Sequence, residues 1–235
     1  MRLVIPVIVA ALVPALAAPP AGAQRLDDMS GIKVAAGFRA AVFATGLAEP
    51  RGLLFVPSGD LYVAEQDSNT VAKISPAAAV TRVAKGFNGV HDLALGADGN
   101  IYAAEMHADR VAVITPAGKV STHIRVRSPV DLDFSPGGEL LVCELYAGRV
   151  VAYKGRAFSR VVASGLSWPH GIVFHSSGAI FINENTGNRI VKVAPDGTVQ
   201  PFAQVDRPVG LVLAKSGNLY VAQPQVGKVS RVAPD

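Results

Sequence analysis

The sequence predicts an all-β protein, a five-bladed β-propeller of four-stranded antiparallel blades, and three observations support this prediction. A motif of about forty residues recurs five times, a glycine follows each copy at a fixed distance, and a short apolar strand follows each glycine. Repeats of this length that hold several short strands are the signature of propeller blades. A helical fold is disfavoured, because no segment shows a sustained period of 3.6 residues.

The repeated motif predicts the first, innermost strand of each blade. Its clearest copies, PRGLLF, PHGIVF and PVGLVL, start at Pro50, Pro169 and Pro208, and looser copies start at Val90 and Pro129. Successive copies lie 40, 39, 40 and 39 residues apart when the third motif position is compared. Equal spacing of this kind indicates that one supersecondary unit is repeated around a ring.

The second, third and fourth strands follow in the same order in each repeat. Glycine tolerates the positive φ of a tight hairpin, and one stands seven residues after the third motif position in every copy: Gly59, Gly99, Gly138, Gly178 and Gly217. The second strands then read LYVAE (61–65), IYAAE (101–105), LLVCE (140–144), IFINE (180–184) and LYVAQ (219–223). Four loop residues separate each second strand from a third, and a turn leads to the fourth.

The chain ends predict how the ring closes. The last repeat stops at Asp235, before its fourth strand, while Val42–Leu47 resembles Val161–Leu166 at the end of a fourth strand. We therefore expect Val42–Ala44 to pair with Lys228–Val232 and complete the last blade. Such pairing removes an exposed sheet edge.

Residues 1–23 are expected to be a secretory signal peptide, residues 24–36 an extension, and residues 37–235 the propeller. Arg2 precedes an almost purely apolar stretch, 3–18, and a small-x-small cleavage site follows it at Ala21–Ala23. The stretch is interrupted by prolines and is shorter than the roughly 20 residues of a membrane span. We expect a secreted or periplasmic protein that has no membrane span after cleavage, and its single cysteine, Cys143, allows no intrachain disulfide.

The net charge of +4 comes without any run of five like charges, so a nucleic-acid partner is not expected. The sequence also lacks a G-x-S-x-G elbow, a phosphate-binding glycine loop, a dinucleotide motif and H-E-x-x-H. Covalent serine chemistry and nucleotide cofactors are therefore disfavoured.

Carboxylates at the ends of four second strands form a candidate ring at one rim of the propeller, where loops would carry function. These are Glu65, Glu105, Glu144 and Glu184, and Gln223 takes the fifth position. A basic residue stands five positions later in four blades (Arg110, Arg149, Arg189 and Lys228), so one interpretation is structural, with cross-strand ion pairs that fix the hairpins. Glu65 has Thr70 at that position instead, so if any member of the ring is free for a metal ion or a proton, Glu65 is the best candidate.

Two aspartates complete a candidate metal site with Glu65. Asp92 and Asp131 occupy a first-strand position that is glycine in the other three blades. Oxygen ligands of this kind suit one divalent cation, Ca²⁺ or Mg²⁺. His91 and His170 share the preceding position two blades apart, and are candidate catalytic bases or ligands, with a hydrogen-bonded rim residue as the alternative.

Candidate ligand-binding residues gather in the fourth blade. Trp168 is the only tryptophan, and Asn183, Glu184 and Asn185 end the second strand of the same blade. Together with Arg51 of the first blade they could bind a planar or sugar-like molecule. The alternative for Trp168 is that it covers a blade junction.

With its repeats aligned, the chain resembles NHL-type and virginiamycin B lyase-like propellers and is similar to the gluconolactonase family. The resemblance rests on the sequence pattern "G-L-x-F…D-G-x-L-Y-V-A-E". The segments that match it most closely are Pro169–Glu184 with Asn188–Ile190, and Asp98–Glu105. It implies a divalent cation in the channel of the lyase and lactonase families, surrounded by acidic, His or Asn residues. It also implies that many relatives bind without catalysis.

Two functions therefore remain open. The first is non-catalytic binding of a small ligand or an extracytoplasmic protein at the channel rim. The alternative is a cation-dependent, lactonase-like hydrolase or lyase that acts on a small molecule. A glycosidase, which needs two or three channel carboxylates, fits the repeat type less well.

Overall fold

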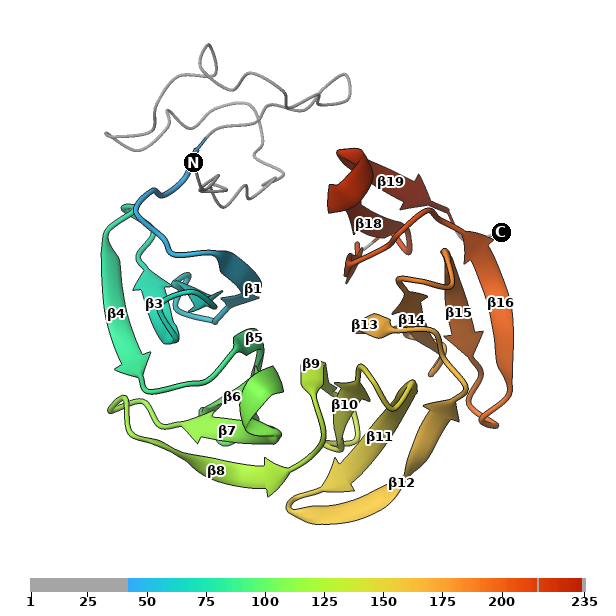
Figure 1. Cartoon of the computed structure of the whole chain (residues 1–235), viewed down its shortest axis with the longest axis horizontal. Helices are drawn as coiled ribbons and strands as arrows, with labels where there is room; N and C mark the ends of the chain where they lie inside the picture. The colour runs from blue at the N-terminus through green and yellow to red at the C-terminus, as the bar shows by residue number, and fades with distance from the viewer. Residues whose placement is uncertain (1–41, 215, 234–235) are drawn as a thin grey trace.

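The computed structural model describes residues 42–214 and 216–233 as five antiparallel sheets arranged in a ring (Figure 1). The signal peptide and the extension that we predict, and residues 37–41 of the predicted propeller, lie outside the described residues. Blade one contains β1 (Pro50–Phe55), β2 (Leu61–Glu65), β3 (Thr70–Ile74) and β4 (Val80–Lys85). Blade two contains β5 (Val90–Leu95), β6 (Ile101–Glu105), β7 (Arg110–Ile114) and β8 (Val120–Arg125). Blade three contains β9 (Pro129–Phe134), β10 (Leu140–Glu144), β11 (Arg149–Lys154) and β12 (Ala157–Ser164).

Blade four contains β13 (Pro169–Phe174), β14 (Ile180–Glu184), β15 (Arg189–Val193) and β16 (Val199–Gln204). Blade five contains β17 (Gly210–Leu213), β18 (Leu219–Gln223) and β19 (Lys228–Val232). Two short 3₁₀ helices, η2 (Met106–Ala108) and η3 (Pro224–Val226), follow second strands. Within the described residues no helix is long and apolar enough to cross a membrane.

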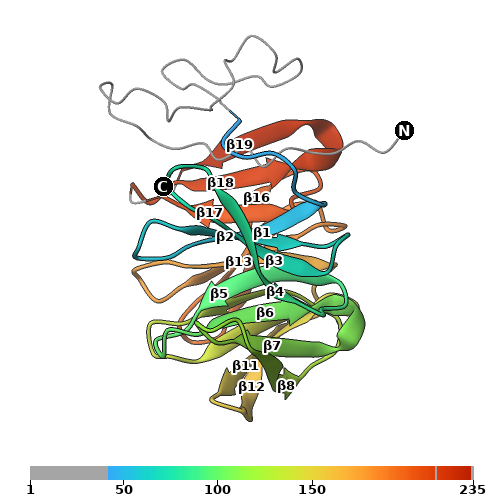
Figure 2. The same cartoon turned by 90° about the vertical axis from the view of Figure 1, so that its left-hand side faces the viewer.

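Strands follow one another in sequence order across each sheet, so every blade is a simple antiparallel meander. β1, β5, β9 and β13 surround the centre of the ring, and β4, β8, β12 and β16 form its outer edge (Figure 1). Seen from the side, the blades stack face to face around the ring (Figure 2). The predicted fold class, five blades of antiparallel strands, is confirmed.

Apolar side chains on the facing surfaces of adjacent sheets hold neighbouring blades together. Leu93 and Ala103 on one face of blade two pack against Ala64 and Val71 of blade one. Blades two, three and four are covered on both faces in this way, which explains why their second strands, such as IYAAE, are buried at every position. Burial at both faces removes the usual in-out alternation from the sequence.

Blade five is the exception, because it has three strands and one exposed face. Val212 is 58% exposed and Val229 is 72% exposed, whereas the equivalent of Val229 in blade one, Val71, is fully buried. Blades one and five also lie apart in Figure 1, unlike the other consecutive blades. The described ring is therefore open between its first and last blades.

The segment before β1 packs against blade one, and the closure that we expect is not shown by the described residues. Ala44 and Leu47 are buried against Leu61 and Val63 of blade one, as Ala84 and the residues that follow it are buried against blade two. The segment that contains Ala44 and Leu47 thus covers the face of blade one in the same way as the end of β4 covers the face of blade two. Pairing of Val42–Ala44 with β19 is not among the strand pairs of the described residues, and it stays a prediction.

Candidate functional site

The start of each innermost strand forms one rim of the ring together with the loop that follows the second strand. The register pairs Pro50 with Glu65 and Pro169 with Glu184, which brings both parts to the same edge. The pairing is irregular over the next residues of β1, β5 and β13, as in a β-bulge. Bulges re-aim side chains next to functional sites, and these irregularities contain Arg51, His91 and His170.

His91 and His170 meet across the ring, although blade three separates their blades. Their ring centroids lie 5.4 Å apart, with the ring planes inclined by 42°. Both side chains are half-buried. The sequence placed them in one layer two blades apart, and the structure brings them into direct contact. We call these two histidines and Arg51 the central cluster.

Burial and positive charge keep both imidazoles neutral. Burial, with contributions from His170 and Arg51, lowers the pKa of His91 to about 3, and the ring hydrogen-bonds the backbone of Val130. Burial, followed by the charge of Arg51, lowers the pKa of His170 to about 4. Arg51 is therefore close enough to influence both rings, and its guanidinium Nη2 also lies 2.5 Å from Glu49 Oε1. At neutral pH the central cluster offers a guanidinium that is already paired with Glu49 and two neutral rings that can donate or accept hydrogen bonds.

The two aspartates lie one layer deeper and bind backbone rather than an open space. The carboxylate of Asp92 accepts the backbone N–H of Leu132, and that of Asp131 accepts the backbone N–H of Ile172. Each aspartate thus ties its own innermost strand to that of the next blade. Burial raises the pKa of Asp92 to about 7, and burial together with the charge of Asp92 raises the pKa of Asp131 well above its usual range.

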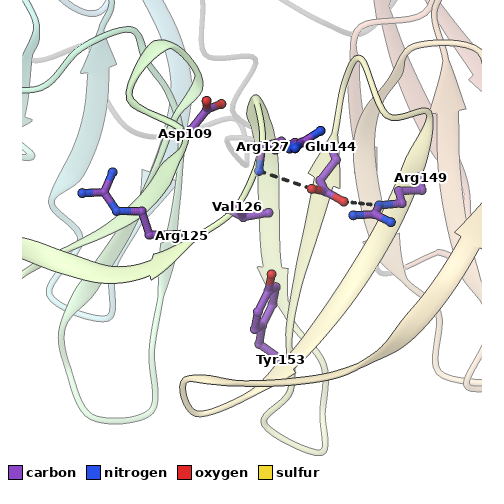
Figure 3. Close-up of a pocket in the computed structure, with 7 residues that line it drawn as sticks. All are labelled: Asp109, Arg125, Val126, Arg127, Glu144, Arg149 and Tyr153. Carbon is purple, nitrogen blue, oxygen red and sulfur yellow. Dashed lines mark hydrogen bonds and ion pairs between the residues drawn. The ribbon is translucent and has the colours of Figure 1, made fainter.

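The four glutamates are structural, as the ion-pair interpretation predicts. Glu105 is buried, and its Oε1 lies 2.6 Å from Arg110 Nε while its Oε2 accepts the Asn88 N–H at 2.9 Å. Glu144 does the same with Arg149 and the Arg127 N–H (Figure 3). Blade four repeats this arrangement at Glu184, with Arg189 and the Ser167 N–H. Each carboxylate therefore fixes both its hairpin and the loop that enters its blade.

The expectation that Glu65 lacks a basic partner is wrong. Arg82 of β4 lies 2.9 Å from Glu65 Oε1 and 3.1 Å from its Oε2, and Thr70 donates to Oε2 at 2.8 Å. In blade two the same two positions are exchanged, because Arg110 stands on the third strand and donates to Thr122 on the fourth. This exchange of Arg and Thr between equivalent positions was the sequence signal for the partner of Glu65.

Three of the predicted ligand-binding residues are buried in blade four. Asn183 donates to the carbonyl of Val209 at 3.1 Å, and Asn185 donates to that of Pro208 at 3.2 Å. Both amides, with the paired Glu184, therefore hold blade four to blade five. The Oδ1 atom of Asn183 has no hydrogen-bond partner among the described residues. Cys143 is fully buried in the core.

The fourth predicted ligand-binding side chain, Trp168, is 44% exposed at the rim. It meets Tyr146, which is 65% exposed and follows β10 in blade three, with ring centroids 5.9 Å apart at 82°. Sequence reasoning missed Tyr146, because hairpin loops vary between blades and carry no repeat signal. Trp168 therefore contacts a neighbouring blade without being covered by it.

A cavity of about 310 Å³ lies between blades two and three (Figure 3). Its lining residues are Asp109, Arg125, Val126, Arg127, Glu144, Arg149 and Tyr153. Two of these are the paired Glu144 and Arg149, so part of the lining serves the hairpin contacts described above. None of the site residues at the centre of the ring contributes to this cavity.

The donor set does not fit a cation held by Glu65, Asp92 and Asp131. Each carboxylate already accepts hydrogen bonds from the protein, and Glu65 is neutralised by Arg82. The described residues contain no group of three or more His, Cys, Asp or Glu side chains arranged to hold a metal ion. A divalent cation therefore stays a prediction of the sequence.

Comparison with solved structures shows the fold in three proteins of different activity. Virginiamycin B lyase from Staphylococcus aureus is 18% identical, with a TM-score of 0.62 over 78% of this chain and 69% of the lyase. A gluconolactonase from Xanthomonas campestris is 16% identical, with a TM-score of 0.69 over 80% of this chain and 76% of that chain. An auxiliary nutrient binding protein from Bacteroides ovatus is 14% identical, with a TM-score of 0.71 over 83% of this chain and 62% of that chain.

The search of curated proteins gave no significant match. At the sequence level, however, the model of the virginiamycin B lyase family matches residues 27–235, which include every described blade. The chain therefore belongs to the virginiamycin B lyase family.

Proposed function

We propose that this protein is exported and binds a small molecule at the central cluster of Arg51, His91 and His170. One observation carries the proposal: two neutral imidazoles from non-adjacent blades meet beside a guanidinium at the centre of the rim. Nothing in the blade repeat requires these residues, since valine takes the same position in blades three and five. Among the relatives of similar fold, one is a nutrient binding protein, which supports binding without catalysis.

The chemistry of the cluster favours a ligand that carries an oxygen acceptor. A guanidinium donates a planar fork of hydrogen bonds that matches a carboxylate, and a neutral imidazole can add one donor. Partial burial strengthens such contacts relative to water. A carboxylate or carbonyl group is therefore the expected anchor.

A lyase or hydrolase reaction is the second candidate, and the place of His170 beside Arg51 at the rim favours it. With its pKa lowered to about 4, the imidazole is unprotonated at neutral pH and has a lone pair for a proton of a bound substrate, but it is a weaker base than an ordinary histidine. Arg51 would then stabilise negative charge that develops on a carbonyl oxygen. The lyase and the gluconolactonase of similar fold make this reaction class worth testing.

Calorimetric titration with phenylacetate, together with an assay of glucono-δ-lactone opening, tests both candidates. Binding by the wild type that is lost in Arg51→Gln and in His170→Ala supports the central cluster as the site. His175→Ala is the matched control, because His175 lies in the turn after β13, where its ring contacts Ser177 and Phe181. Lactone opening that disappears in His170→Ala while phenylacetate still binds favours the enzyme. Binding that all three variants retain contradicts the proposed site.

Because the donor set does not fit a cation at Glu65 and Asp92, the double variant Glu65→Gln with Asp92→Asn should leave the metal content of the purified protein unchanged. Export is tested by N-terminal sequencing of protein recovered outside the cytoplasm, with cleavage after Ala23 as the expected result.

A further inference from the structure

We propose that Tyr146 and Trp168, the aromatic pair, form a platform on which a planar ring of the bound molecule stacks. The proposal rests on the proposed function and names the class of ligand: a small molecule with an aromatic ring and an oxygen acceptor. The acceptor would contact the central cluster and the ring would contact the aromatic pair.

The first argument is exposure. The two side chains come from different blades and meet edge to face at 5.9 Å, yet they remain 65% and 44% exposed. Two other aromatic residues, Tyr102 and Phe181, lie in second strands and are buried between blades. An exposed aromatic pair contributes little to the core and leaves ring surface free for a third ring, because aromatic rings prefer stacked or edge-to-face partners.

The second argument is the backbone of Trp168, which has a φ of 54°. Every blade needs a positive φ at this position, and the other four use Glu49, Gly89, Ser128 and Arg207. A bulky side chain is disfavoured in this region of backbone conformation. The side chain of Trp168 is exposed, so core packing does not explain why tryptophan occupies the position.

The third argument is the distance to the central cluster. Trp168 stands two residues before His170, so their Cα atoms are at most about 7 Å apart. The backbone N–H of Asn185 donates to the carbonyl of Trp168 at 3.0 Å and fixes the loop that carries the indole. A ligand of the size of a phenyl ring with a short carboxylate arm is long enough to reach from one group to the other.

The chain itself supplies the reporter for a test. Trp168 is its only tryptophan, so intrinsic tryptophan fluorescence reports on this position alone. We would titrate the full mature protein with phenylacetate and with cyclohexylacetate, which has the same charge and nearly the same size but no aromatic ring. Phenylacetate should change the emission saturably and bind about 3- to 10-fold more tightly, as expected from one aromatic contact.

Tyr146→Ser should remove most of this preference, and calorimetry should show that the affinity for cyclohexylacetate is unchanged. Phe158→Ser is the matched control, because Phe158 is an aromatic residue, 57% exposed, that pairs with Tyr153 away from the rim. Trp168→Leu should behave as Tyr146→Ser in calorimetry. Thermal unfolding of each variant checks that it is folded.

The results separate failure of the platform from failure of the site. If both acids bind equally, or Tyr146→Ser weakens both equally, the platform is wrong, and Arg51→Gln still tests the central cluster. If neither acid binds saturably, both proposals are overturned. If Tyr146→Ser converts a dimer into a monomer in sedimentation, the pair is a protein contact and the platform is overturned.

Discussion

Replacing Glu105 by alanine should lower the free energy of unfolding by about 3 kcal/mol. The side chain of Glu105 is fully buried, and it joins Arg110 at 2.6 Å to the backbone N–H of Asn88 at 2.9 Å. A hydrogen bond to a charged group contributes about 1.5–3 kcal/mol, and an orphaned buried donor costs about 1–3 kcal/mol. The two effects are not fully additive, because Arg110 is 21% exposed and can regain water.

Urea denaturation followed by circular dichroism measures this loss, with unchanged m-values as the sign that the same surface unfolds. For a domain of this size 1 kcal/mol corresponds to about 2–4 °C, so the melting temperature should fall by about 6–12 °C. Glu105→Gln should cost less, about 1–2 kcal/mol, because the amide oxygen still accepts the Asn88 N–H.

The control for this prediction is Glu139→Ala, which removes an ion pair with the half-exposed Arg160 on the outside of blade three. Exposed pairs contribute about 0–1 kcal/mol. If Glu105→Ala is no more destabilising than Glu139→Ala, the glutamates do not hold the blades together, and the structural interpretation of the glutamate ring is wrong.

Three further predictions concern the inner strands and the ring closure. The raised pKa of Asp92, about 7, means that the folded state holds the carboxyl proton more tightly than the unfolded state does. The free energy of unfolding should therefore fall as the pH rises from about 4 to about 7. Asp92→Asn should flatten this pH dependence in urea titrations. Gly52→Ala would place a Cβ 2.6 Å from Asp92 Cα and should cost about 1–3 kcal/mol in thermal unfolding, whereas Gly210→Ala, whose Cβ meets a side chain at 3.3 Å, should cost less. Thr45→Cys with Lys228→Cys should form an intramolecular disulfide in mass spectrometry if the N-terminal segment closes the ring, and a dimer or free thiols would contradict that closure.

Strand positions could be predicted from the sequence because each blade repeats the same local requirements. The hairpin of β2 and β3 pairs Glu65 with Thr70, and that of β14 and β15 pairs Glu184 with Arg189, at the five-residue spacing that the sequence shows. Both partners of each pair lie on one hairpin, so no long-range geometry is needed to place them.

Contacts that depend on the fourth strand could not be predicted in the same way. The pairing of β3 with β4 shifts between Val71 and Ala72, which brings Arg82 opposite Ala72 and within reach of Glu65. A bulge changes which residues face each other and leaves no simple mark in the sequence. The contact between Tyr146 and Trp168 was hidden for a related reason, because it joins loops of different blades.

Departure from the repeat is therefore an incomplete guide to function, and exposure supplies the missing criterion. Asp92 departs from the glycine of other blades, yet its carboxylate is buried and ties one innermost strand to the next. Asn183, on the second strand of blade four, stands where β6 has an alanine. Its side-chain amide donates to the carbonyl of Val209 and so also joins adjacent blades. Both are alternative solutions to one structural problem, the joining of adjacent blades. By contrast, Arg51 and Trp168 depart from the repeat and keep their polar or aromatic groups open to solvent at one rim, which is where a ligand can reach them.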